Sequence, residues 1–118
     1  VLLSTVNSRR ILLSGDVEGD GLASILRRPP VICDVVLAPH HGSSRSNPPG
    51  LAQWSLPSWV VVSGTADTAG VVRHAYESVG AKILETTKVG AVTVDVLTSG
   101  EVRVSMFREE RSQGERGP

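Results

Sequence analysis

Residues 34–46 read DVVLAPHHGSSRS, and the rest of the chain is organised around them. The apolar run at 35–37 is typical of a short buried strand, and it ends at Pro39. His40 and His41 follow directly, so two imidazoles stand just beyond the carboxyl end of a predicted strand. Open α/β sheets bind their ligands at that end, because the loops there project side chains into a shared crevice. We therefore expect the functional site at this loop.

A second apolar run has the same form. Residues 11–16 read ILLSGD, so a carboxylate, Asp16, also follows a predicted strand. Imidazole nitrogen and carboxylate oxygen are the ligands of catalytic zinc and manganese sites, whereas structural zinc sites are rich in thiolate. Asp16, His40 and His41 together thus indicate metal-activated hydrolysis. The alternative, from the residues alone, is that the histidine pair is a polar turn and that Asp16 caps a helix.

Length and composition favour a single globular domain. The chain has 118 residues, and its aromatic content of 3% predicts a core of small and β-branched side chains. Twelve basic and twelve acidic residues cancel, so a nucleic-acid contact needs a local patch, for which Arg9, Arg10 and Arg45 are the candidates. Cys33 is the only cysteine, which excludes an internal disulfide and a cysteine-built zinc site, and its apolar neighbours predict a buried thiol. No apolar stretch reaches the roughly 18 residues of a membrane span, so we expect a soluble domain, and one that begins inside a longer protein because Val1 is not Met.

Hydrophobic periodicity and turn residues divide the chain into alternating elements. We expect strands at 1–6, 10–14, 31–38, 59–62, 82–86, 91–97 and 101–107. We expect helices at 20–28, with Asp16 or Asp20 as its cap, between Asn47 and Pro57, with Asn47 as its cap, and around Val72–Val79, with Tyr76 on its core face. Strands alternating with helices predict an α/β sheet. Residues 108–118 contain no apolar side chain and are expected to be a disordered tail, which leaves residues 1–107 as the domain.

The order of the motifs resembles a known family. The chain contains LLSGDVEGDGLASIL at 12–26, CDVVLAPHHGSSRS at 33–46, LPSWVVVSG at 56–64 and VGAKILETTKVGAVTVDV at 79–96. In that order they resemble the carboxyl-terminal metallo-β-lactamase-like domain of ComEC-type DNA-uptake (competence) proteins. The resemblance implies an α/β fold that is half of a metallo-β-lactamase αβ/βα sandwich, with a mixed sheet and helices on one face.

The same resemblance implies a function. It implies a nuclease-like hydrolase that acts on phosphodiester bonds of single-stranded DNA with two divalent ions, zinc or manganese. Asp16 resembles the ligand that bridges the two metals, and either His40 or His41 supplies an imidazole while the other orients a ligand or the substrate. Gly42, Ser43 and Arg45 are the expected substrate contacts. The implied partners are the upstream half of the same domain, the membrane-channel part of the parent protein on the outer side of a bacterial inner membrane, and a second copy of the chain at the exposed sheet face.

Two features depart from the family pattern. The family's histidine-rich metal motif has no counterpart in residues 1–14, so the chain corresponds to the second half of the fold. The family's Gly-His-Pro element is replaced by TADTAG at 65–70, where Asp67 is the only substitute ligand. A catalytically inactive module with a structural or nucleic-acid-binding role is therefore the alternative function. A hydrolase of lactams or thioesters and a Ser-His nucleophile at Ser43 or Ser44 are weaker alternatives, and His74 is expected to be an ordinary surface histidine.

Overall fold

The computed structural model describes residues 2–15, 17–64 and 68–107. The strands are β1 (Leu2–Val6), β2 (Arg9–Leu13), β3 (Val35–Leu37), β4 (Trp59–Val62), β5 (Lys82–Glu85), β6 (Ala91–Val96) and β7 (Val102–Phe107). The helices are α1 (Gly19–Leu26), α2 (Pro49–Ser55), α3 (Gly70–Glu77) and the short α4 (Thr86–Val89), with a single 3₁₀ turn, η1 (Pro39–Gly42), after β3. This alternation confirms the α/β class.

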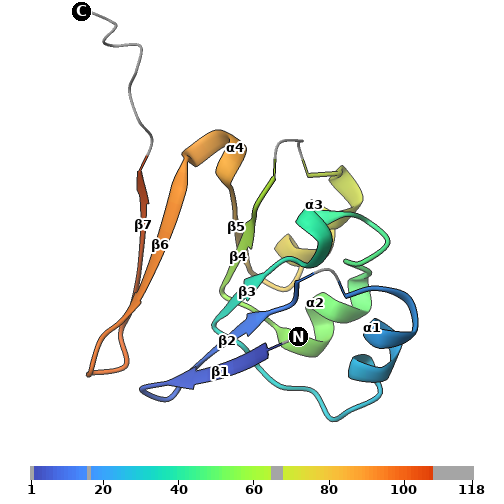
Figure 1. Ribbon diagram of the computed structural model, residues 1–118, viewed down its shortest axis with the longest axis horizontal. Helices are drawn as coiled ribbons and strands as arrows, with labels where there is room; N and C mark the ends of the chain where they lie inside the picture. The colour runs from blue at the N-terminus through green and yellow to red at the C-terminus, as the bar shows by residue number, and fades with distance from the viewer. Residues whose placement is uncertain (1, 16, 65–67, 108–118) are drawn as a thin grey trace, which may run out of the picture.

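Five strands form one mixed sheet in the order β1-β2-β3-β4-β5. β1 pairs with β2 in antiparallel orientation, and β2, β3, β4 and β5 are parallel neighbours. Each parallel pair is joined through a helix, and crossovers of one handedness that always step in one direction place their helices on one face of the sheet. Figure 1 shows α1, α2 and α3 together on that side. A mixed sheet with helices on one face is thus confirmed.

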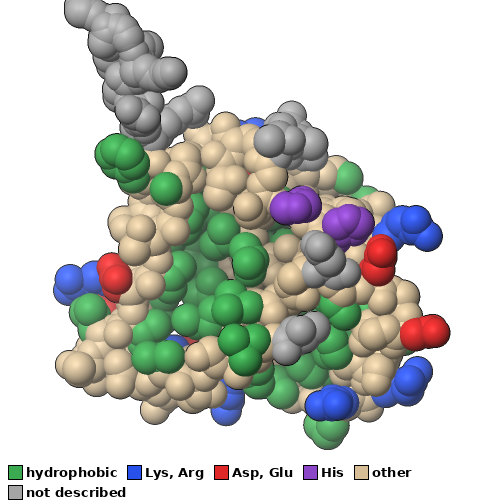
Figure 2. Space-filling view, in the orientation of Figure 1, with side chains coloured by type: hydrophobic (Ala, Val, Ile, Leu, Met, Phe, Trp, Pro, Cys, Tyr) green, Lys and Arg blue, Asp and Glu red, His purple; other side chains and the backbone are tan. Residues whose placement is uncertain are grey.

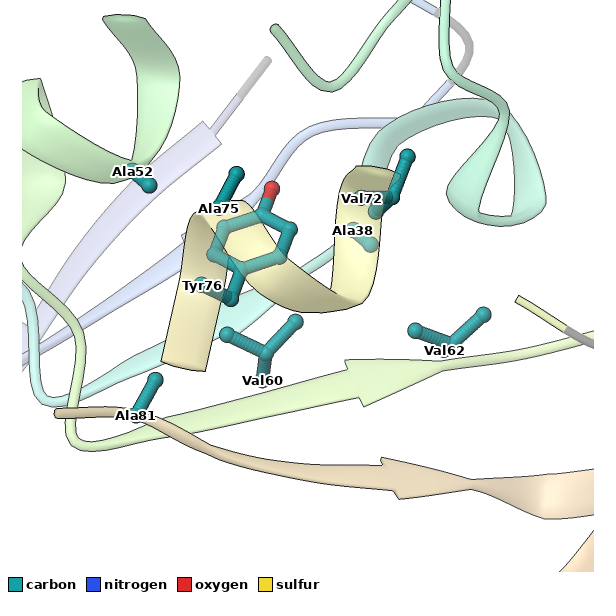
Figure 3. Close-up of a cluster of buried hydrophobic side chains, with 8 residues drawn as sticks. All are labelled: Ala38, Ala52, Val60, Val62, Val72, Ala75, Tyr76 and Ala81. Atoms are coloured by element: carbon teal, nitrogen blue, oxygen red, sulfur yellow. The ribbon is translucent and has the colours of Figure 1, made fainter. Parts of the chain in front are cut away.

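Two apolar clusters fill the space between the sheet and these helices. One joins the sheet to α2 and α3 around Tyr76, which is 1% exposed, and Figure 3 shows its eight buried side chains. The other joins β2 and β3 to α1 and α2, and it contains Leu12, Leu22, Cys33, Val36, Leu51 and Trp54. Cys33 is 1% exposed, as expected for a buried thiol.

The opposite face of the sheet meets the β6–β7 hairpin. β6 alternates exposed and half-buried residues, and its Val92 and Val94 line a hollow of about 240 Å³ against β2, β3 and β4. Figure 2 shows hydrophobic side chains gathered in this hollow. The tips of the two hairpins are joined by Asn7, whose amide donates to the Leu97 carbonyl (2.9 Å), and by Arg9, whose Nε donates to the Gly100 carbonyl (2.6 Å). We call the face of the sheet that is turned toward this hairpin, and that carries Ile11, Leu13, Val35, Leu37 and Val61, the hairpin-side face.

The structure corrects the expected ends of several strands, and the differences at β2, β6 and β7 are of one residue. The strand expected at 31–38 contains only Val35–Leu37, because the Cys33 N–H donates to the Ser55 carbonyl of α2 instead of to a neighbouring strand. The strand expected at 82–86 ends at Glu85, and Thr86 begins α4, a helix that the sequence pattern does not predict.

The structure also corrects two caps. Asp20 lies within the first turn of α1, whose N-cap is Glu18, and Pro48 rather than Asn47 is the N-cap of α2. Asp16 as a cap, and the tail at 108–118, lie outside the described residues. Among the helices that the structure describes, none is long and apolar enough to cross a bilayer.

Candidate functional site

The carboxyl ends of the four parallel strands lie along one edge of the sheet. They lead into Ser14–Gly15 after β2, Pro39–His40 after β3, Ser63–Gly64 after β4 and Thr86 after β5. The first two segments are in direct contact, since the His40 N–H donates to the Gly15 carbonyl at 2.7 Å. The loop that carries the histidines therefore lies beside the residue that precedes Asp16, although Asp16 itself is outside the described residues.

The two histidines occupy an uncommon backbone conformation. His40 has φ 49° and His41 has φ 54°, both in the left-handed region, and Gly42 follows with φ 79°. For residues with a Cβ this conformation costs about 1–2 kcal/mol each, so neighbouring contacts must stabilise it. Such strain often marks functional loops. Here the Ser43 N–H closes the turn onto the His40 carbonyl at 3.0 Å.

Buried polar side chains hydrogen-bond to the backbone of the turn that carries the histidines. Asn47 donates through Nδ2 to the Pro39 carbonyl (3.0 Å) and to the Ser43 carbonyl (2.7 Å), which flank the histidine pair. Its Oδ1 accepts a hydrogen bond from the Tyr76 hydroxyl at 2.6 Å. Burial raises the pKa of Tyr76, so the hydroxyl remains a donor. The sequence pattern indicates a cap at Asn47 and a core residue at Tyr76, and it gives no sign that the two meet.

Two glycines permit close packing around the loop. A Cβ on Gly42 would lie 2.8 Å from Cγ1 of Val62, which explains why the backbone can turn against β4 there. A Cβ on Gly64 would lie 3.3 Å from Cβ of His41. Gly42, which is an expected substrate contact, thus also lets the backbone bend at this point.

The hydrogen bond made by His41 defines which ring nitrogen carries its proton. Nδ1 of His41 lies 2.7 Å from the Ser63 carbonyl oxygen. A carbonyl only accepts, so Nδ1 carries the proton and Nε2 of the neutral ring keeps its lone pair. Metal-binding histidines in proteins characteristically donate their other ring N–H to a carbonyl or carboxylate in this way. His41 is exposed, so the lone pair can be reached by a ligand.

His40 has a different environment. Its Nδ1 lies 3.7 Å from Oε1 of Glu18 at the start of α1, and both side chains are about half exposed. The two rings are tilted by 50°, with centroids 6.4 Å apart. The two imidazoles therefore have different partners, although they are adjacent in the sequence.

The remaining predicted residues are dispersed. Arg45 is exposed on the histidine loop, and Ser43 is half-buried with a side-chain oxygen that has no partner in the structure. Arg9 and Arg10 lie at the other end of β2, roughly 13 Å from its carboxyl end given the rise of a strand. They bind Asp34, the Gly100 carbonyl and the Ile32 carbonyl, so they do not form one basic patch with Arg45. His74 is exposed on α3, as expected.

The far end of the same edge carries a buried carboxylate. Glu85 is 3% exposed and accepts hydrogen bonds from the Thr68 N–H at 2.8 Å and from Arg73 of α3, and Lys88 lies 3.3 Å from it. Burial alone would raise the pKa of Glu85, but these donors and charges outweigh it and hold the pKa below its ordinary value. Glu85 is thus an ionised tie between β5 and α3, which no motif in the sequence signals.

The described residues do not bring together a complete metal-ligand set. Imidazoles suit zinc or manganese, but residues 2–15, 17–64 and 68–107 include no group of three His, Cys, Asp or Glu side chains close enough to hold an ion. Asp16 and the predicted substitute Asp67 are outside those ranges. His41 is the described side chain that best fits a ligand.

No family model, curated protein or solved structure matches this chain.

Proposed function

We propose that this chain is the carboxyl-terminal half of a metal-dependent, nuclease-like hydrolase domain of a ComEC-type DNA-uptake protein, acting on phosphodiester bonds of DNA. The observation that carries the proposal is the His41 ring. It stands at the carboxyl edge of the parallel strands, its Nδ1 proton is donated to the Ser63 carbonyl, and the residue is exposed. Its partners in the proposal are the upstream half of the domain and the membrane-channel part of the parent, on the outer side of a bacterial inner membrane.

In this proposal Asp16 and Nε2 of His41 hold zinc or manganese together with side chains of the upstream half. Catalytic zinc sites take about three protein ligands, which is more than the described residues of this chain bring together. When bound, the metal supplies Lewis acidity toward a phosphoryl oxygen and activates water. Asn47 and Tyr76 keep the histidine loop in its strained conformation, so His41 does not have to be ordered when the metal binds.

The DNA contacts follow from the same loop. Arg45 is exposed beside the histidines, and a guanidinium binds phosphate with two parallel hydrogen bonds. His40, which faces Glu18 and has no backbone partner for its ring among the contacts described, contacts the substrate in this proposal. Gly42 and Ser43 complete the surface that meets the DNA backbone. Sequence-independent contacts to phosphate suit an enzyme that degrades any strand.

The test is degradation of single-stranded DNA by the complete domain of the parent protein, with zinc or manganese, and with the metal content measured on each variant. We expect Asp16→Ala and His41→Ala to lose both metal and activity. His40→Ala should retain metal and lose activity by about 10–100-fold, the size of effect seen for residues around a metal site. His74→Ala is the matched control on an exposed helix surface and should change neither quantity. Full activity of Asp16→Ala, or equal and negligible effects of both histidine substitutions, would contradict the proposal.

The alternative is a catalytically inactive module with a structural or nucleic-acid-binding role. It is favoured by the loop at 65–70, which contains no histidine where the family pattern has one. In that case the complete domain would bind DNA without degrading it, and Arg45→Ala would weaken binding more than His41→Ala would. Arg9 and Arg10 lie at the opposite end of β2 and do not reach the histidine loop. In this alternative Arg45 is therefore the arginine of that loop that contacts the DNA.

A further inference from the structure

We propose that Thr86 is a positioning residue for His41, and that it acts through the peptide bond between Ser63 and Gly64. The Gly64 N–H donates to Oγ1 of Thr86 at 3.3 Å, and the Ser63 carbonyl accepts the Nδ1 proton of His41 at 2.7 Å. Both hydrogen bonds belong to the same peptide unit. The inference rests on the proposed function only in giving His41 the role of a metal ligand.

The planarity of the peptide bond couples the two hydrogen bonds. Its N–H and C=O lie in one plane and point in opposite directions, so an anchor on the N–H also fixes the direction of the C=O. The two hydrogen bonds also polarise each other, because an amide that donates is a better acceptor. Thr86 therefore fixes the carbonyl that selects the Nδ1–H form of His41.

Strand pairing brings Thr86 to this place. Val62 of β4 is opposite Glu85 of β5 at the last pair of the ladder, so Ser63 and Thr86 both lie one residue beyond it. Glu85 is in turn held by Arg73 and the Thr68 N–H, which fixes the backbone immediately before Thr86. The hydroxyl is thus presented by the rigid end of the sheet rather than by a free loop.

Gly64 keeps the peptide close to the ring. An added Cβ on Gly64 would lie 3.3 Å from Cβ of His41, tighter than ordinary van der Waals contact. A side chain at this position would push the histidine away from the Ser63 carbonyl. The missing side chain and the threonine hydroxyl therefore serve the same end, which is a short and directed hydrogen bond to Nδ1.

The direct consequence is the tautomer of His41. In water a free neutral imidazole favours the form with the proton on Nε2, which has no lone pair at that nitrogen for a metal. The carbonyl of Ser63 reverses this preference, since the ring nitrogen that finds an acceptor keeps the proton. Removing the anchor on the peptide should return His41 toward the Nε2–H form.

The test is two-dimensional nitrogen–proton NMR of the histidine rings in the 118-residue chain, without metal, at an alkaline pH where the rings are neutral. We expect His41 in the Nδ1–H form and Thr86→Val to shift it to a mixture or to the Nε2–H form. Thr86→Ser keeps the hydroxyl and should restore the original tautomer. Thr87→Val is the matched control, because Oγ1 of Thr87 is buried on the same helix with no hydrogen-bond partner in the structure.

Further measurements keep the inference falsifiable and separate from the proposed function. Amide exchange at Gly64 should be slowed in the native chain and fast in Thr86→Val. A native His41 in the Nε2–H form, a freely exchanging Gly64 amide, or an unchanged tautomer in a folded Thr86→Val would each overturn the inference, and the first two need no variant. In the complete parent domain, Thr86→Val should lower metal affinity by about 10–100-fold. The complete domain could show the expected tautomer change in Thr86→Val and yet not degrade DNA. This result would support the role of Thr86 and contradict the proposed nuclease activity.

Discussion

The two faces of the five-stranded sheet are covered differently at the carboxyl ends of β2 and β3. Leu12 on the helix side is 3% exposed, whereas its neighbour Leu13 on the hairpin-side face is 40% exposed. In β3, Val36 is fully buried and Leu37 is only half-buried. The contrast is confined to the carboxyl ends of these strands, because Val35 and Val61, which also lie on the hairpin-side face, are only 3% and 9% exposed.

This difference indicates that the sheet has room for a further covering element on one face. Strands that are apolar on both faces are typical of sheets with a cover on each side. Here the helices bury Leu12, Val36 and Val60 of the central strands but leave Leu3 of β1 42% exposed, and the β6–β7 hairpin provides a partial cover that leaves the hollow between Val94 and the sheet. The hairpin-side face is therefore the surface on which the proposed upstream half, or a second copy of the chain, would pack.

The largest difference between the faces should appear when a core residue on each side is truncated. Tyr76→Ala removes a ring that is 1% exposed and should lower the free energy of unfolding by about 3–5 kcal/mol. Leu13→Ala on the hairpin-side face should cost about 1 kcal/mol or less, because Leu13 is already partly in water. Urea unfolding measures both. If Tyr76→Ala does not fold, Tyr76→Phe should still cost about 1–3 kcal/mol, since it leaves Oδ1 of Asn47 without its donor. Equal losses on the two faces would refute the comparison.

Close packing on the helix side should extend to the histidine loop. Gly42→Ala combines a left-handed backbone, which costs about 1–2 kcal/mol, with a clash against Val62 that costs about 1–3 kcal/mol. Gly70→Ala is the control, because a Cβ there meets nothing within 4 Å at the start of α3. It should stabilise the chain slightly, by about 0.4–1 kcal/mol. Thermal or urea unfolding distinguishes the two, and an unchanged Gly42→Ala would show that the loop is loosely packed.

The helix side should also respond to acid through Glu85. Its pKa is lowered in the folded chain, so the stabilisation is complete above the ordinary carboxyl pKa near 4.5 and is lost as the pH falls through the folded value. Glu85→Gln should flatten the fall of the urea midpoint below about pH 4.5 and lower stability at neutral pH, because Arg73 loses its partner. Glu101→Gln is the control, because Glu101 is an exposed carboxylate at the tip of the β6–β7 hairpin. It should leave the dependence of the urea midpoint on pH unchanged. An identical acid profile for Glu85→Gln would contradict the tie between β5 and α3.

The smallest effect on unfolding should come from a charge on the hairpin-side face. Leu13→Lys should change the free energy of unfolding by about 0.5 kcal/mol or less, as for other surface substitutions. It should nevertheless weaken self-association, which we expect for the native chain because an open apolar face favours a second copy. Sedimentation equilibrium measures this, and Val71→Lys, 61% exposed on the outside of α3, is the control that should still associate. A native chain that stays monomeric at all concentrations would show that the hairpin is a sufficient cover.

Much of the fold follows from pattern alone. β4 has the expected bounds, and the alternation of strands and helices places Gly15 and His40 at one edge of the sheet before any contact is known. The start of α4 could not be predicted, since TTKV has neither a cap nor a helical period, and the Thr86 hydroxyl accepts its hydrogen bond from the Gly64 N–H, 22 residues away in the sequence. Hydrophobic periodicity does not predict hydrogen bonds between residues that are far apart in the sequence.

The candidate site is predictable only in part, for the same reason. Residue types and spacing identify the histidine pair, but its left-handed backbone is not visible in a sequence that lacks glycine at those positions. Asn47 before two prolines has the pattern of a helix cap, yet its amide binds the carbonyls on either side of the histidines. The Ser63 carbonyl, which gives His41 a partner that His40 does not share, is a backbone group that no side-chain motif can reveal.

The strand order also has a consequence for how the chain acquires its structure. Because every strand of the main sheet pairs with its neighbour in the sequence, each new strand and helix can add to an edge that already exists. Loops to be closed at each step stay short, which favours fast folding for a sheet that is mostly parallel. A chain emerging from the ribosome could thus assemble from β1 toward β5 in order of synthesis. The His40 turn would then lie against Gly15 before Ser63 and Thr86 arrive, so the last strand of the sheet to be made is also the one that completes the alignment of His41.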